Sequence, residues 1–174
     1  MSMNVAVVGA GSWGTTVAHL CCHNTRTLLY SRRDDVVESI NGSRENSRYL
    51  AGFELHTDLR ASTDLAEVVS TADALVMGVP SHGFRATLAM TRDHLPAGVP
   101  VISLAKGLER GTNLRMTQII DQELDGHPGG VLTGPNLAKE ILAGHAAAAV
   151  IAIDDLEIAR RLQSVIATEL FRVY

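Results

Sequence analysis

Short apolar runs alternate with amphipathic stretches along this chain. The run at 4–8 is rich in valine and ends in glycine, which is typical of a buried strand. Residues 13–23 instead carry Gly14, Val17, Ala18 and Cys21 at helical spacing, so that one face turns toward a sheet. The same pattern predicts further strands at 27–30, 74–79, 99–104, 130–132, 147–153 and 170–174.

Amphipathic helices are predicted between most of these strands. One begins at Asp34 or Asp35, another carries Phe84 and Leu88, and another occupies 136–142. Two more are marked by the apolar stripes Met116, Ile119, Ile120, Leu124 and Ile158, Leu162, Val165, Ile166, the second capped by Asp154 or Asp155. The alternation predicts an α/β fold, a doubly wound and mostly parallel sheet with helices on both faces. The polar, aperiodic stretch 42–52 is expected to be a long loop, and such loops are often functional.

Composition narrows the function classes. The 174 residues fit one domain spanning 1–174, and the net charge of -4 without a basic run argues against nucleic acid or membrane as partners. The only cysteines, Cys21 and Cys22, are adjacent, which excludes a disulfide scaffold and a cysteine-rich metal site. Reduced cysteines and the absence of a signal-peptide pattern favour the cytoplasm. Lysine is rare: only Lys106 and Lys139 occur among 15 basic residues.

The first predicted turn carries a phosphate-binding motif. Gly9, Gly11 and Gly14 form G-x-G-x-x-G between a strand and a helix, the context in which this motif is specific for dinucleotides. Gly9 permits the tight turn, Gly11 lets a pyrophosphate approach the backbone, and Gly14 lets helix and strand pack closely. Ser12 and Trp13 are expected to face the ligand, although Trp13 is equally well explained as a hydrophobic plug.

The tip of the second strand indicates which dinucleotide is bound. An acidic residue there would bind the ribose 2′-hydroxyl of NAD, whereas this strand ends in Arg32 and Arg33. A guanidinium matches a 2′-phosphate through paired hydrogen bonds. We therefore expect NADP to be favoured, or both NAD and NADP to be accepted; the alternative is that the two arginines are simply solvated.

Other strand tips converge on the same crevice. Lys106 follows the strand at 99–104, where an ammonium could neutralise a phosphate or polarise a carbonyl. Gly134 and Pro135 begin a turn after the strand at 130–132, and Asn136 is expected to cap the next helix. These tips predict a substrate site beside the cofactor.

Together these residues resemble the bacterial-type NAD(P)-dependent glycerol-3-phosphate dehydrogenases. The resemblance covers the whole chain and rests on five motifs in order: Gly9-Ala10-Gly11-Ser12-Trp13-Gly14-Thr15, Asn46-x-x-Tyr49-Leu50-x-Gly52-x-x-Leu55, Val79-Pro80-Ser81, Ala105-Lys106-Gly107-Leu108-Glu109 and Gly134-Pro135-Asn136-Leu137-Ala138-Lys139-Glu140. It implies a Rossmann-like domain and hydride transfer between NAD(P)H and dihydroxyacetone phosphate, giving sn-glycerol 3-phosphate for phospholipid synthesis.

The resemblance also assigns residues. It implies cofactor contacts at Ser12, Trp13, Arg32, Arg33, Tyr49 and Ala138, substrate contacts at Gly134 and Asn136, and contact with both at Lys106. Asn136 departs from the Ser or Thr that is common at its position.

Members of this family continue into a helical C-terminal domain, which closes the crevice and brings an acid/base lysine in a Lys-Asn pair. The chain ends at Tyr174 without that pair. We therefore expect the N-terminal part of a two-domain enzyme, with Lys106 assisting a main catalytic lysine beyond Tyr174. Such a part would bind cofactor and turn over poorly or not at all.

The parent enzyme could be a homodimer. Two alternative functions remain open at this point. The chain could belong to another reductase with a similar first domain, such as a ketopantoate reductase or a 2-hydroxyacid-type dehydrogenase. It could also be a non-catalytic module that senses NAD(P)H.

Overall fold

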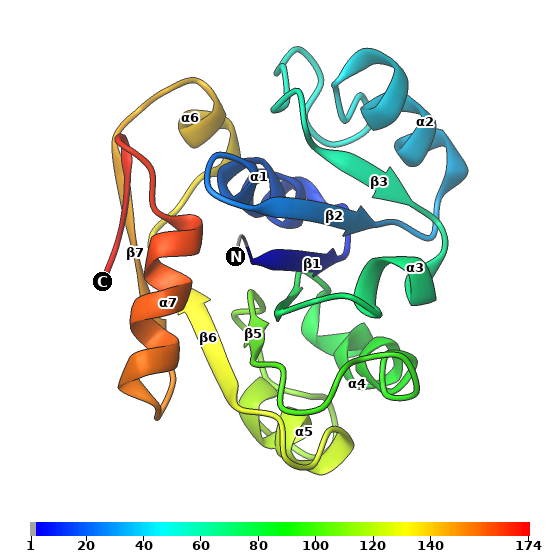
Figure 1. Cartoon of the computed structure of the whole chain (residues 1–174), viewed down its shortest axis with the longest axis vertical. Helices are drawn as coiled ribbons and strands as arrows, with labels where there is room; N and C mark the ends of the chain where they lie inside the picture. Colours follow the sequence, from blue (N-terminus) through cyan, green and yellow to red (C-terminus); the bar gives the residue numbers. More distant parts are fainter. Residues whose placement is uncertain (1–2) are drawn as a thin grey trace.

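The computed structural model describes residues 3–174 and shows an α/β fold built on one sheet (Figure 1). Within this range eight strands follow the order β3-β2-β1-β4-β5-β6-β7-β8. All neighbours are parallel except β6 and β7, which are antiparallel. The strands are β1 (Asn4–Val8), β2 (Arg26–Tyr30), β3 (Arg60–Ser62), β4 (Ala74–Met77), β5 (Val101–Ser103), β6 (Gly129–Thr133), β7 (Ala147–Ala152) and β8 (Phe171–Val173).

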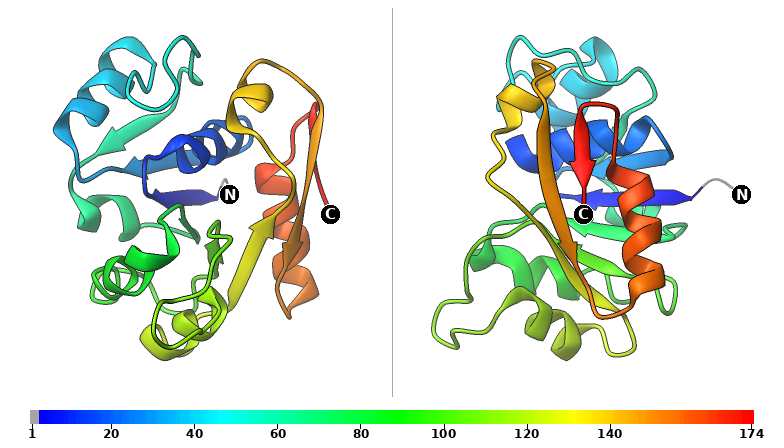
Figure 2. Two further views of the ribbon diagram at one scale, coloured as in Figure 1. Left: turned by 180° about the vertical axis from the view of Figure 1, so that it is seen from behind. Right: turned by 90° about the vertical axis from the view of Figure 1, so that its left-hand side faces the viewer.

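Helices cover both faces of the sheet, as the alternating pattern predicts. They are α1 (Ser12–Cys22), α2 (Asp34–Ser43), α3 (Leu65–Val69), α4 (Ser81–Ala89), α5 (Met116–Glu123), α6 (Ala138–Leu142) and α7 (Leu156–Ile166). Apolar residues of α1, α2, α6 and α7 form one core cluster, and those of α3, α4 and α5 form the other. The two edge strands of the sheet, β3 and β8, lie at opposite sides of the molecule (Figure 2).

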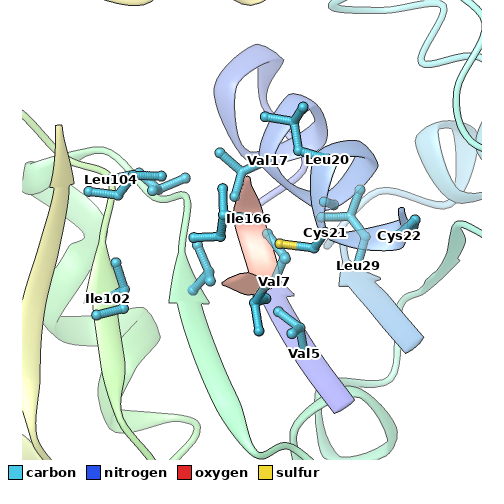
Figure 3. Packing of buried hydrophobic residues seen from close by; sticks show 14 of the residues in the cluster. Val5, Val7, Val17, Leu20, Cys21, Cys22, Leu29, Ile102, Leu104 and Ile166 are labelled. Atoms are coloured by element: carbon cyan, nitrogen blue, oxygen red, sulfur yellow. The ribbon is translucent and has the colours of Figure 1, made fainter. Parts of the chain in front are cut away.

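The central strand β1 supplies both cores. Val5 and Val7 pack into the first cluster, and Ala6 and Val8 pack into the second. Figure 3 shows Cys21 of α1 over β1. This two-sided burial explains why β1 is a continuous apolar run. The glycine turn follows directly after this buried strand.

Two sequence predictions need correction, the loop at 42–52 and the cap at Asn136, and the structure adds features that the sequence did not predict. The stretch 42–52 is not all loop, because α2 continues to Ser43. The short elements β3 and α3 were not expected, and β7 runs antiparallel to β6. The cap predicted at Asn136 is absent, because the helix begins one residue later with Leu137 at its N-cap and no side-chain cap. At the last helix Asp155 is the cap, and its carboxylate accepts hydrogen bonds from the amides of Glu157 and Ile158.

The cysteines are free and buried, and burial raises the pKa of the Cys22 thiol to about 11. No helix among residues 3–174 combines the length and apolar character needed to cross a membrane.

Candidate functional site

The turn between β1 and α1 contains two glycines at which a side chain would collide with backbone and a third, Gly11, at which it would not. Gly9 has a φ of +114°, and a Cβ there would lie 2.7 Å from the carbonyl oxygen of Gly78. A Cβ on Gly14 would lie 2.0 Å from the carbonyl oxygen of Gly9. A Cβ on Gly11 would meet nothing within 4 Å. The fold therefore requires glycine at 9 and 14, whereas Gly11 leaves free space at the start of the helix.

The first turn of α1 offers donors to that space. Gly11 is the N-cap and makes no side-chain capping bond, and the first turn contains no acidic residue. The first hydrogen bond of the helix runs from the amide of Thr15 to the carbonyl of Gly11 at 2.9 Å. The amides of Ser12, Trp13 and Gly14 therefore have no acceptor within the helix, and they sit at the positive end of its dipole. This arrangement fits a pyrophosphate.

A buried asparagine holds the glycine turn in place. Asn46 is fully buried, and its Nδ2 donates to the carbonyl of Ala10 at 3.0 Å and to Oγ1 of Thr15 at 2.9 Å. The loop after α2 thereby reaches the turn, and Ser12 Oγ donates to the carbonyl of Tyr49 at 3.4 Å. Ser12 and Tyr49, both predicted cofactor residues, are thus neighbours. The positioning role of Asn46 was missed, although it belongs to one of the five motifs.

Trp13 makes the contact expected of a plug. Its ring packs edge-on against Phe171, with centroids 6.3 Å apart. Trp13 remains partly exposed at the start of α1, beside the free amides.

The two arginines at the tip of β2 differ in their surroundings. Arg32 is exposed and forms no ion pair within residues 3–174. Arg33 donates two hydrogen bonds of 2.9 Å to the Asp35 carboxylate, from Nε to Oδ1 and from Nη2 to Oδ2. Arg48 adds a weaker contact of 3.9 Å to the same carboxylate and lies over the ring of Tyr49. The Arg33 guanidinium lowers the pKa of Asp35, so a carboxylate competes for this positive charge.

Lys106 and Gly134, predicted to face one crevice, are joined directly. Lys106 Nζ donates to the carbonyl of Gly134 at 2.8 Å, which ties the tip of β5 to the tip of β6. The Nδ2 of Asn136 is buried and has no hydrogen-bond partner within the described residues. A buried amide without an acceptor is costly, so Asn136 offers a donor for an oxygen of a ligand. Ala138 begins α6 just beyond it.

The glycine turn and the contact between Lys106 and Gly134 both lie at the carboxyl ends of parallel strands. The tip of β4 stands between them, where Gly78 approaches Gly9. A cavity of about 870 Å³ borders Lys106 and extends between α5 and β6 toward Asp154 and Asp155. The residues of the glycine turn are not among those that line this cavity.

A doubly wound sheet with a glycine turn opening onto free helix amides defines a dinucleotide-binding domain. The family model described as NAD-dependent glycerol-3-phosphate dehydrogenase N-terminus matches residues 4–159. The chain therefore belongs to this family, an assignment that goes against the other reductases considered from sequence.

Curated relatives that match this chain are described as glycerol-3-phosphate dehydrogenases [NAD(P)+]. The chain is 51% identical over 171 residues to a glycerol-3-phosphate dehydrogenase [NAD(P)+] of Mycobacterium avium, covering 98% of this chain and 50% of the relative. It is 52% identical over 174 residues to one of Sphingopyxis alaskensis, covering 100% of this chain and 52% of the relative. The chain thus spans about half the length of these relatives.

A solved structure of a glycerol-3-phosphate dehydrogenase has the same fold as this chain. The glycerol-3-phosphate dehydrogenase of Coxiella burnetii superposes with a TM-score of 0.92 at 28% identity, covering 99% of this chain and 53% of that one. A pyrroline-5-carboxylate reductase from the same organism, at 16% identity and a TM-score of 0.71, shares the fold alone.

Proposed function

We propose that this chain is the cofactor-binding domain of a glycerol-3-phosphate dehydrogenase that interconverts dihydroxyacetone phosphate and sn-glycerol 3-phosphate with NAD(P)H. The observation that carries the proposal is the space at Gly11, where a Cβ would meet no atom of the described residues within 4 Å, next to first-turn amides of α1 that have no acceptor within the helix. Family membership supplies the chemistry, and the product would serve glycerophospholipid synthesis in the cytoplasm. The same proposal includes domain limits of 1–174 and a homodimeric parent enzyme.

The cofactor would lie across the tips of β1 and β2. The turn Gly9, Gly11 and Gly14, with the amides of Ser12 and Trp13, would hold the pyrophosphate. Arg32 and Arg33 would hold a ribose 2′-phosphate, which favours NADP over NAD. Of these two arginines Arg32 is the more available to a 2′-phosphate, because Arg33 is already paired with the carboxylate of Asp35.

Other residues complete the cofactor and substrate sites. Tyr49, beside Ser12, and Ala138, at the start of α6, would contact the bound cofactor. Lys106, Gly134 and Asn136 would hold the phosphorylated triose or glycerol.

Lys106, whose Nζ reaches the carbonyl of Gly134, would be the charged group that assists the substrate chemistry. When bound, the reduced nicotinamide supplies the hydride. Lys106 would then stabilise negative charge on the substrate oxygen or phosphate, and the Nδ2 of Asn136 would orient the substrate by one hydrogen bond. A proton donor for the nascent alkoxide is still needed. We place this main acid/base lysine outside the 174 residues, so we expect this chain to bind cofactor and to catalyse weakly or not at all.

Calorimetric titration of the purified chain with NADPH and NADH tests the proposal. We expect both to bind, NADPH more tightly, and Arg32→Ala to weaken NADPH more than NADH. Arg26→Ala is the matched control, because Arg26 is exposed at the opposite end of the same strand. If neither NADPH nor NADH binds, the proposal is overturned. Steady oxidation of NADPH with dihydroxyacetone phosphate would overturn the claim that the main catalytic lysine lies elsewhere.

A further inference from the structure

The segment that carries Lys106 is held from one side by a single face of α4. Ser81 and Arg85 are four residues apart on this helix, so they share a face. A Cβ on Gly107 would lie 2.8 Å from Ser81 Oγ, which places the backbone of the segment against the start of the helix. One turn later Arg85 reaches Glu109. The two contacts fall one and three residues after Lys106.

The contact between Arg85 and Glu109 is a two-pronged ion pair. Arg85 Nε donates to Oε1 of Glu109 at 2.7 Å, and Nη2 donates to Oε2 at 2.9 Å. Thr112 Oγ1 donates to the same Oε2 at 2.6 Å. The Glu109 side chain is only 15% exposed. These bonds lower the pKa of Glu109 to about 2 and raise that of Arg85, so both stay charged near neutral pH.

Arg85 is itself fixed by α5. Its Nη1 donates to Oε1 of Glu123 at 2.5 Å, and its Nη2 also donates to Oε1 of Gln122 at 2.8 Å. The packing of α4 on α5 does not depend on these bonds alone, because buried apolar side chains also join the two helices. Arg92 provides a second ion pair to Glu123, with Nη2 donating to Oε2 at 2.5 Å. Arg85 is thus anchored to α5 through Glu123 and Gln122, and its paired hydrogen bonds to Glu109 connect it to the segment that carries Lys106.

We propose that the Arg85–Glu109 ion pair positions Lys106 for its work at the cofactor and substrate. By fixing the backbone three residues beyond Lys106, with Ser81 restraining Gly107, the pair directs the lysine side chain across to the carbonyl of Gly134. Arg85 and Glu109 are positioning residues, since neither reaches the glycine turn or Gly134. This inference rests on the proposed function, because it is that function which gives Lys106 a role.

The scarcity of lysine provides a direct readout. A chain labelled with ¹³C-lysine has only two lysine Cε signals, from Lys106 and Lys139, and Lys106→Arg assigns them. In Arg85→Met and in Glu109→Gln we expect the Lys106 Cε signal to move and sharpen, while the Lys139 signal stays in place. Arg92→Met is the matched control, because it removes an ion pair of the same network without touching Glu109.

Binding of NADPH provides the second readout. We expect its dissociation constant to rise roughly threefold to tenfold in Arg85→Met and Glu109→Gln, and less than about twofold in Arg92→Met. Arg85→Lys should recover part of the loss, because an ammonium can replace one prong of the fork. Glu109→Gln preserves the shape of its side chain, so it carries the test if Arg85→Met fails to fold.

The outcomes separate the two proposals. If the wild-type chain binds no NADPH, the proposed function fails, yet the Lys106 signal without ligand still tests the ion pair. An unmoved Lys106 signal in both variants overturns the positioning role. A loss of NADPH binding equal to that in Arg92→Met also overturns it, because the effect would then be general destabilisation.

Discussion

Replacing Gly11 with alanine separates what the fold needs from what the ligand needs. Its φ of -74° and ψ of 179° suit alanine, and the new methyl group would meet no protein atom within 4 Å. Alanine is a poorer N-cap than glycine, but it also lowers the entropy of the unfolded chain. These opposing effects leave stability within about 1 kcal/mol of wild type, a shift of less than about 4 °C in Tm.

The effect on binding should be far larger. The methyl group would occupy the space through which a pyrophosphate approaches the amides of Ser12 and Trp13. Each charge-assisted hydrogen bond to such an amide contributes roughly 1.5–3 kcal/mol, so losing one weakens NADPH binding about tenfold or more.

Calorimetric titration and thermal melts of Gly11→Ala measure the two effects side by side. Gly42→Ala is the control, because Gly42 also has no neighbour within 4 Å of a built Cβ but lies in α2. We expect it to bind NADPH like wild type. Wild-type NADPH affinity in Gly11→Ala would refute the placement of the pyrophosphate at this turn.

Three further predictions follow from the geometry. Gly14→Ala should lower Tm by several degrees, because its Cβ would lie 2.0 Å from a backbone oxygen and overpacking costs about 1–3 kcal/mol; an unchanged melt would contradict the packing. Asp35→Asn should release Arg33 and raise the NADPH-to-NADH affinity ratio roughly twofold to fivefold, whereas a lower ratio would mean that Asp35 orients Arg33 for the phosphate. Burial lowers the pKa of His19 to about 4, and its Nδ1 accepts the amide hydrogen of His56. Between that pKa and the ordinary value of about 6.5 the unfolded chain binds the extra proton, so stability should fall as pH falls, by less than about 1 kcal/mol per pH unit. Melts of His19→Asn, which keeps an acceptor but cannot titrate, should show a weaker fall; an equal fall would contradict this assignment.

Much of the fold could be predicted because burial leaves a periodic trace. β1 is buried on both faces and reads as an unbroken apolar run, and the stripe of α7 lies at helical spacing. The glycine turn could be predicted for a related reason: Gly9 and Gly14 stand where a side chain would collide with backbone, so their spacing is a direct consequence of the fold.

The features that were missed leave no such trace. In β3 only Ala61 is buried, so three residues show no apolar run. Strand direction is not encoded in the burial pattern of β7, which alternates in the same way whichever way it pairs. Asn136 suits a cap by residue type, but α6 starts one position further on, with Leu137 at its N-cap, and a residue pattern does not fix a helix start to a single residue.

The details of the site depend on contacts between distant residues. Arg33 could be predicted as a strand-tip cation, but its pairing with Asp35 requires the geometry of the turn into α2. The bond between Lys106 and Gly134 spans 28 positions, and that between Arg85 and Glu109 spans 24. A single sequence gives these residues as separate polar positions, and only the packing of the strand tips brings them together.

The central claim is that a dinucleotide binds at the start of α1, and the single tryptophan allows a direct test. Trp13 is the only tryptophan, and it occupies the first turn of that helix. We predict that adding NADPH to the purified chain quenches its tryptophan emission saturably, with energy transfer to the nicotinamide, and that Gly11→Ala needs about tenfold more NADPH for the same effect. Tryptophan emission that does not change saturably with NADPH in the folded wild-type chain would contradict the account.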